Sequence, residues 1–196
     1  MTVSSFNTVT LTPQPIISFN VRRPSETLQA LLSSGRFLVH LLAPNPQTAS
    51  LARDFSRGNQ NLALGEGQFE FVGIKPLVGT AAQDQTQSNS VTGNAAPNQE
   101  DALASLPPLP MLRRRGVSQG SSAGVTPEKG SDFDSFPFVF ECRLLAESVS
   151  QVYDHTIVVG TIVRALTGSE DAEGSSEDLC LTYANTKFWE VGKEVV

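Results

Sequence analysis

Side chains that could do chemistry are densest at the start of the sequence, where hydroxyls follow one another at short spacing. They are Thr2, Ser4, Ser5, Thr8, Thr10 and Thr12. Hydroxyls and nearby backbone amides can hydrogen-bond a polar ligand such as a phosphate or the edge of a heteroaromatic ring. Ser and Thr are equally at home in turns and strands that bind nothing. The pattern alone favours the structural interpretation and leaves a ligand surface as the alternative.

A second candidate is the segment Arg22-Arg23-Pro24-Ser25-Glu26-Thr27, in which two arginines precede a predicted helix start. The N-terminus of a helix attracts anions because its first N–H groups lack helical partners and the helix dipole is positive there. The segment therefore suggests a phosphate site. Without other information, an ordinary helix cap beside solvated arginines is the simpler interpretation.

The two histidines lie in different contexts. His40 lies inside an apolar run, which favours a structural, hydrogen-bonded imidazole, whereas His155 follows Tyr153 and Asp154 at the start of the longest predicted strand. Adjacent strand residues point to opposite faces, so we expect no catalytic dyad between Asp154 and His155. A histidine facing a ligand at the strand mouth is the functional alternative. A serine hydrolase is disfavoured because the sequence has no Gly-x-Ser-x-Gly elbow.

Composition excludes several other classes. The chain has 196 residues, with 14 basic and 20 acidic side chains and a net charge of -6, which disfavours nucleic acid as a partner. No apolar run is long enough to span a membrane, and no secretory signal is visible. Two cysteines, Cys142 and Cys180, and two scattered histidines predict neither a disulfide framework nor a metal site. We expect a reducing, cytoplasmic location, with organelle targeting by an upstream segment left open. Dinucleotide and Walker loops are also absent from the sequence.

Three polar, low-complexity stretches divide what we predict to be a single domain over residues 1–196. They cover residues 79–107, 117–135 and 168–178. Ordering a residue costs about 1–2 kcal/mol, and these stretches have too little apolar surface to offset that cost, so we predict disordered loops. The last stretch holds five of the 20 carboxylates, so without it the net charge changes from -6 to -1. The acidity therefore says little about a substrate.

The remaining sequence is rich in strand patterns. Strands are predicted at residues 15–21, 37–42, 138–145 and 155–166, with a weaker one at 179–183. Gly160, inside the longest run, suggests a bulge or a close backbone approach.

Two short helices lie between the early strands. The first is predicted between an N-cap at Ser25 and Gly35, and the second between an N-cap at Asn45 and Gly58. Because strands dominate, we predict a mainly β fold, a small barrel decorated with short helices.

The first 21 residues, MTVSSFNTVTLTPQPIISFNV, resemble the signature of the flavin reductase-like family, whose members have an FMN-binding split β-barrel. Four later segments fit the family in the same order. They are Arg22 to Leu31, Gly35 to Leu42 with LARDF at 51–55, Phe140-Glu141-Cys142-Arg143, and YDHTIVVG at 153–160. The last resembles the family's Gly-Asp-His-x-x-x-x-Gly stretch, with Tyr153 where Gly is usual.

The resemblance implies a role for each candidate residue. Ser4, Ser5, Thr8, Val9 and Thr10 would face the isoalloxazine and ribityl chain, partly through backbone N–H groups. Ser25 and Thr27, with Arg22 or Arg23, would hold the flavin phosphate. His155 would lie near the nicotinamide side as the catalytic candidate, and Asp154 would brace the loop. The cofactor would be FMN, with FAD as the alternative, and NAD(P)H would be the co-substrate.

The chain also departs from the family pattern. His40 stands where the family often has Asn, and long loops precede Phe136. Relatives carry one or two strands upstream of this start, so the resemblance implies an N-terminally truncated barrel.

Two functions follow from the resemblance. The first is an NAD(P)H-dependent flavin oxidoreductase, a homodimer that supplies reduced flavin to a monooxygenase. The second is a non-catalytic, truncated split-barrel module that binds flavin or acts through partners.

Overall fold

A computed structural model describes residues 1–57, 67–75, 107–115, 135–167 and 181–189. The predicted loops 79–107, 117–135 and 168–178 lie outside the described residues, apart from Pro107 and Ser135. The predicted loop 117–135 wrongly includes Ser135, which is buried and whose carbonyl accepts a hydrogen bond from Ala43 N at 3.0 Å. No described helix is long and apolar enough to cross a membrane.

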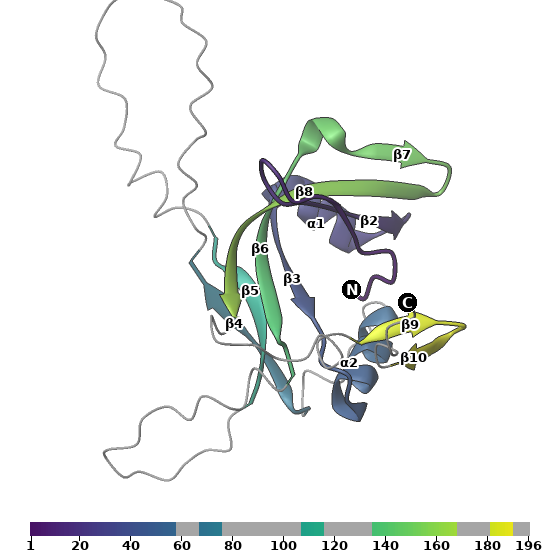
Figure 1. Cartoon of the computed structure of the whole chain (residues 1–196), viewed down its shortest axis with the longest axis vertical. Coiled ribbons are helices and arrows are strands. Elements are labelled where there is room, and N and C mark those ends of the chain that lie inside the picture. The colour runs from purple at the N-terminus through teal and green to yellow at the C-terminus, as the bar shows by residue number, and fades with distance from the viewer. Residues whose placement is uncertain (58–66, 76–106, 116–134, 168–180, 190–196) are drawn as a thin grey trace, which may run out of the picture.

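One antiparallel sheet forms the centre of the fold, with strand order β1-β2-β8-β6-β3 and β7 paired to β8. The bounds are β1 Asn7–Thr10, β2 Ile16–Arg22, β3 Arg36–Leu41, β6 Phe138–Leu144, β7 Ser150–Val152 and β8 His155–Thr167. The first half of β8 pairs with β2 and β7, and its second half pairs with β6. This long strand therefore curves from one part of the sheet into the other (Figure 1).

The two predicted helices are present with the expected N-caps. Helix α1 spans Glu26–Ser34, and the Ser25 hydroxyl accepts a hydrogen bond from Leu28 N. It ends at Gly35, whose φ of 66° is readily available to glycine. Helix α2 spans Pro46–Ser56 and is capped by Asn45. It ends before Gly58, which lies outside the described residues. A short 3-10 turn, η2, covers Ala146–Ser148.

Two small ribbons accompany the sheet. Strand β4 Phe69–Ile74 pairs with β5 Leu109–Arg114, and β9 Thr182–Ala184 pairs with β10 Lys187–Trp189. The β4–β5 ribbon escaped sequence reasoning, whereas the weak prediction at 179–183 overlaps β9. With the four stronger strands also confirmed, the mainly β fold with short helices is correct.

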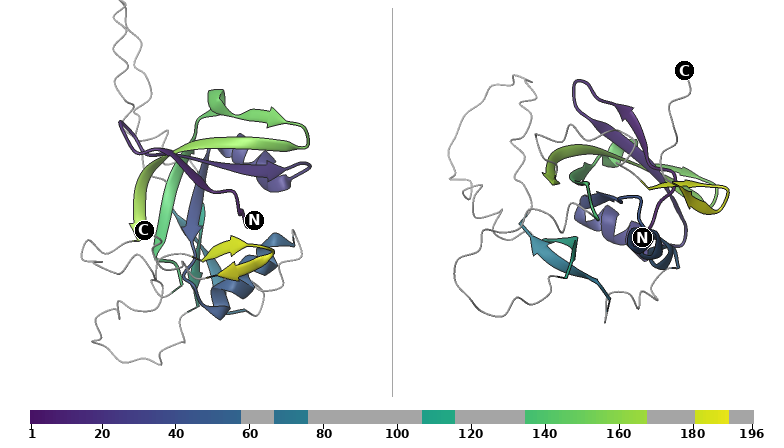
Figure 2. Two further views of the ribbon diagram at one scale, coloured as in Figure 1. Left: turned by 45° about the vertical axis from the view of Figure 1, so that its right-hand side comes forward. Right: turned by 60° about the horizontal axis from the view of Figure 1, so that its bottom comes forward.

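Two apolar clusters form the core. The first joins α1 to β2 and β8 through buried residues: Phe19, Val21, Leu28, Leu31, Leu144 and Val158. The second joins α2 to the β4–β5 ribbon and β6: Leu51, Phe69, Leu112, Phe136 and Val139. At the chain start, the hydroxyl of Thr2 donates to Ala52 O at 2.6 Å, which holds this end against α2 (Figures 1 and 2).

Gly160 marks a close approach within the sheet, one of the two alternatives expected from the sequence. A Cβ placed there would lie 2.7 Å from Cζ of Phe37 and 3.0 Å from the carbonyl oxygen of Arg143. The Phe37 ring therefore occupies the space that any other residue at position 160 would need.

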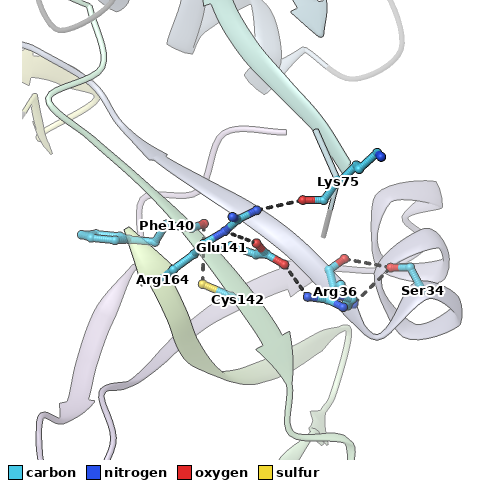
Figure 3. A network of polar contacts seen from close by, with 7 residues as sticks. All are labelled: Ser34, Arg36, Lys75, Phe140, Glu141, Cys142 and Arg164. Atoms are coloured by element: carbon cyan, nitrogen blue, oxygen red, sulfur yellow. Dashed lines mark hydrogen bonds and ion pairs between the residues drawn. The ribbon is translucent and has the colours of Figure 1, made fainter. Parts of the chain in front are cut away.

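A charged network crosses β8, β6 and β3, which are consecutive in the sheet order (Figure 3). The Glu141 side chain is fully buried on β6 and accepts hydrogen bonds from Arg36 on β3 and Arg164 on β8. The Nε–Oε2 distance to Arg164 is 2.7 Å, and the same guanidinium donates to Lys75 O at 2.8 Å. One carboxylate thus joins three strands of the sheet to the residue that follows β4.

His40 connects the sheet to the β4–β5 ribbon. Its Nε2 accepts a hydrogen bond from Leu112 N at 3.1 Å, and its ring makes an edge contact with Phe136. Burial lowers the pKa of His40 to about 4. The imidazole is therefore a neutral acceptor at neutral pH, which confirms the structural role expected from the sequence.

We expect Glu141→Gln to lower the free energy of unfolding by about 2–3 kcal/mol. The change keeps the side-chain shape but leaves two arginines without their shared counter-charge, and both arginines keep some access to water. Urea denaturation measures the loss. Glu70→Gln is the matched control, because Glu70 is one-third exposed beside Arg113 and should contribute less than about 1 kcal/mol. Equal losses in the two variants would contradict the central role of Glu141.

Stability should fall between about pH 6.5 and pH 4 through His40. The unfolded chain protonates this group near its ordinary pKa of 6.5, whereas the folded chain resists protonation until about 4. The unfolded state therefore gains protons first as pH falls, with a loss of up to about 3 kcal/mol. His40→Gln keeps an acceptor for Leu112 N without this titration. Unfolding curves at several pH values should show a flatter profile for the variant, and identical profiles would refute the assignment.

Candidate functional site

The candidate residues around His155 meet where β2 ends and β8 begins. The register sets Arg22 opposite His155 and Asn20 opposite Ile157, so these side chains share one face of the sheet. Ser18, two residues before Asn20, lies opposite Asn7 of β1 on that same face. A row of polar side chains thus crosses β1, β2 and β8.

Asp154 connects two of these residues, although the sequence led us to expect that Asp154 and His155 point to opposite faces of a strand. Its Oδ1 lies 2.8 Å from Nδ1 of His155, and its Oδ2 accepts from Nε of Arg22 at 3.2 Å. The expectation failed because Asp154 belongs to the turn between β7 and β8, so strand alternation does not apply to it. The hydrogen bond from His155 lowers the pKa of Asp154. A carboxylate only accepts, so Nδ1 carries the proton and Nε2 is the nitrogen left for a ligand.

Arg23 holds the same turn from the other side. Its backbone N–H donates to Asp154 O at 2.7 Å, and its Nη2 donates to Tyr153 O at 2.6 Å. Its Nε is buried and has no hydrogen-bond partner among the described residues. A buried cationic donor without a partner is costly, which marks a place where an anion would be stabilised.

Tyr153 occupies the first position of a two-residue turn, since Val152 pairs with His155. Its φ of 50° lies in the left-handed region, where a side chain costs about 1–2 kcal/mol. Hairpin turns of this length need positive φ at that position and favour Gly, Asn or Asp there. The tyrosine side chain is 93% exposed, so packing does not offset this cost.

The start of α1 has the features of an anion site, although Ser25 also serves as the helix cap. The Ser25 hydroxyl accepts from Leu28 N at 3.2 Å, so Ser25 is first of all the helix cap. Its own O–H can still donate outward. Helix geometry gives the N–H group of Thr27 no helical acceptor. Of the two arginines before the helix, Arg22 is paired with Asp154, and Arg23 carries the orphaned nitrogen.

The N-terminal hydroxyls divide into structural and available groups. Ser5 Oγ accepts from Asn20 N at 2.8 Å, and Thr10 Oγ1 donates to Thr12 O at 2.8 Å, so both serve the chain itself. Ser4 and Thr8 are exposed. Val9 is the extra residue of a bulge, because Thr8 and Thr10 lie opposite consecutive residues of β2.

The parts of the candidate site lie along β2 rather than around one point. Ser5 adjoins Asn20, near the end where Arg22 and His155 lie, whereas Thr10 lies opposite Ile16. Ile16 and Arg22 are six residue steps apart along the extended strand, about 20 Å. A single ligand that touched all the candidates would have to be elongated.

Other reactive groups offer little. Burial raises the pKa of the Cys142 thiol to about 12, so it is a packing residue without nucleophilic character. Within the described ranges, no group of three or more His, Cys, Asp or Glu side chains could hold a metal ion.

Comparisons with known proteins agree with this architecture. The NADH:FAD oxidoreductase SgcE6 of Streptomyces globisporus C-1027, solved with NAD and FAD fragments, is similar in structure. The TM-score is 0.51 at 15% identity, covering 99% of this chain and 78% of that one. The flavin reductase component BorF of a bacterial two-component tryptophan halogenase gives 0.49 at 18% identity, covering 98% and 81%. The styrene monooxygenase flavin reductase of Pseudomonas putida S12 gives 0.47 at 19% identity, covering 98% and 81%.

At such identities, structural similarity concerns the fold, and a TM-score above 0.5 is reached with SgcE6. The family model for the flavin reductase like domain matches residues 1–106, which is more than half of the sequence. The chain therefore belongs to the flavin reductase-like family.

Proposed function

We propose that this protein binds a flavin along β1 and β2 and transfers hydride to it from NAD(P)H. The observation that carries the proposal is the cluster where β2 ends. There, the capped start of α1 lies on one side of Pro24, and Arg23, whose Nε has no partner in the described part of the chain, lies on the other. Asp154 orients His155 in the adjoining turn. A phosphate group and a redox-active ring system are the two ends of FMN, which the ribityl chain joins.

The Arg23 guanidinium is the cationic group that best fits a phosphate in this cluster. Arg23 is fixed by its bonds to Tyr153 O and Asp154 O, so its guanidinium charge is held next to the start of α1. Two residues later, Ser25 can donate its hydroxyl hydrogen, and Thr27 contributes a first-turn N–H. We infer that Arg23, more than the paired Arg22, balances the charge of the phosphate.

The N-terminal segment would contact the rest of the flavin. Strand β1 forms one edge of the described sheet, and an edge strand has backbone N–H and C=O groups outside the ladder. Those groups and the exposed Ser4 and Thr8 would hydrogen-bond the ring edge and ribityl chain, with Val9 and Thr10 beside them. Ser5 would act indirectly, by holding this segment against Asn20.

The flavin, when bound, supplies the redox chemistry by accepting hydride at N5. The chain's part is to bind and orient the reactants. His155 is held by Asp154 so that Nε2 faces away from the carboxylate, available to a polar atom of the nicotinamide. No acid–base side chain is required for this reaction. This fits a site whose histidine, His155, is exposed and is oriented by one carboxylate, Asp154.

The proposal extends to the flavin and to partners. SgcE6 is described as an NADH:FAD oxidoreductase, so FAD is the alternative to FMN, and NADH is the first co-substrate to test. We further propose a homodimer that supplies reduced flavin to a separate monooxygenase. Sedimentation of the flavin-loaded protein tests the homodimer.

Ser25→Asp should weaken FMN binding about tenfold or more without unfolding α1. Aspartate is a good N-cap, so it replaces the Ser25 acceptor for Leu28 N, but its charge opposes the phosphate. Ser25→Asn is the matched control with the cap and no charge. Quenching of flavin fluorescence gives the dissociation constants.

Riboflavin, which has no phosphate, should bind both variants alike. Equal FMN affinity for the Asp and Asn variants would remove the phosphate from the α1 start. Failure of the unaltered protein to quench any flavin would overturn flavin binding itself.

His155→Ala should lower the rate of NAD(P)H-dependent flavin reduction about tenfold, the effect of one lost hydrogen bond of about 1.4 kcal/mol to a bound reactant. Flavin affinity should hold, because His155 is exposed and anchors no core residue. Stopped-flow reduction and a melting curve measure both effects. A lower melting temperature with an unchanged rate would make His155 structural. His40→Gln is a control that removes a histidine away from the site.

A further inference from the structure

Tyr153 is the residue of this site that neither the fold nor the proposed flavin contacts explain. It places a side chain where glycine is usual, at a φ of 50°, and leaves that side chain 93% exposed. Local strain and exposure of an aromatic ring both oppose its presence. Strained positions of this kind persist where the surrounding structure fixes them, and they are concentrated at binding sites.

The surrounding structure does fix this turn. Arg23 bonds the carbonyls of both Tyr153 and Asp154, and the Asp154 side chain joins Arg22 to His155. The backbone that bears the Tyr153 ring is thus held by several hydrogen bonds, beside the proposed nicotinamide side of the site.

We propose that Tyr153 is a co-substrate-binding residue that stacks its ring on the nicotinamide of the dinucleotide co-substrate. The inference rests on the proposed function. Hydride transfer moves the electron pair of the nicotinamide C4–H bond to N5 of the flavin, so the nicotinamide is oxidised to a pyridinium cation and the flavin is reduced. The face of a tyrosine ring attracts cations, so Tyr153 favours the charge that develops on the nicotinamide and binds NAD(P)+ more tightly.

The position of the turn favours the nicotinamide over the flavin as the stacking partner. The flavin candidates follow β1 and β2, whereas Tyr153 lies beyond Arg22, on the hairpin that β7 forms with β8. The charge of the oxidised ring also distinguishes the two, because the cation arises on the nicotinamide.

The test compares Tyr153→Asn with Tyr153→Phe. Asparagine tolerates positive φ and removes the ring, whereas phenylalanine keeps the ring without the hydroxyl. NADH and NADPH oxidation gives KM, inhibition by NAD+ or NADP+ gives Ki, and titration of the flavin-loaded protein with NAD(P)+ gives Kd independently of turnover.

We expect the asparagine variant to raise the Ki and Kd of NAD(P)+ about fivefold and to raise KM by less. The phenylalanine variant should match the unaltered protein, and flavin affinity and melting temperature should be kept in both. Unchanged NAD(P)+ binding in the asparagine variant overturns the proposal, and so does a loss of flavin affinity, which would place the ring on the flavin.

The two proposals fail in different ways. A protein that binds NAD(P)+ through Tyr153 but reduces no flavin would refute the oxidoreductase function and keep the stacking. A protein that reduces flavin with unchanged kinetics in the asparagine variant would refute the stacking alone. If NAD(P)+ does not bind the flavin-loaded protein, the stacking is overturned, and flavin reduction by NAD(P)H decides the oxidoreductase function separately.

Discussion

The buried carboxylate of Glu141 is the interaction on which the rest of the sheet depends. Three strands that are distant in sequence bring Arg36, Glu141 and Arg164 together, and the network reaches the end of β4 through Lys75 O. Removing a carboxylate from water is unfavourable, and two guanidinium groups offset that cost only in one relative register of β3, β6 and β8. The network therefore fixes the second half of β8, while the first half remains for the site.

The candidate site uses the same long strand at its other end. The register of β8 with β2 places His155 opposite Arg22, and the hairpin with β7 places Asp154 between them. The backbone of the residues that would contact the ligand is therefore held by the hydrogen bonds of β8 with β2 and β7. The segment before β1 differs, because it is held outside any ladder. Ser5 Oγ accepts a hydrogen bond from Asn20 N of β2, and Thr2 donates to Ala52 O and Phe55 O of α2.

The helices and strands that could be predicted from the sequence are those whose signals lie within a few neighbouring residues. The caps at Ser25 and Asn45 and the β-branched run of β8 each carry their evidence within a few residues. The β4–β5 ribbon was missed because its two short strands are separated by a long polar stretch, so no turn signal joins them. The contact of Asp154 with His155 depended on where a strand begins. The Glu141 network was invisible, since its partners lie 105 and 23 residues away. The left-handed backbone of Tyr153 left one trace, a residue where the family usually has glycine.

The contact between Gly160 and Phe37 constrains how this sequence can change over evolutionary time. Any side chain at position 160 collides with the ring first and with the Arg143 carbonyl behind it. The ring can shrink by substitution, but the backbone oxygen cannot. Alanine at position 160 therefore needs both a smaller residue at position 37 and a shift of the Arg143 carbonyl oxygen by a few tenths of an ångström. Positions 37 and 160 should vary together or remain fixed. In close homologues, a glycine at position 160 of β8 should accompany a large aromatic residue at position 37 of β3.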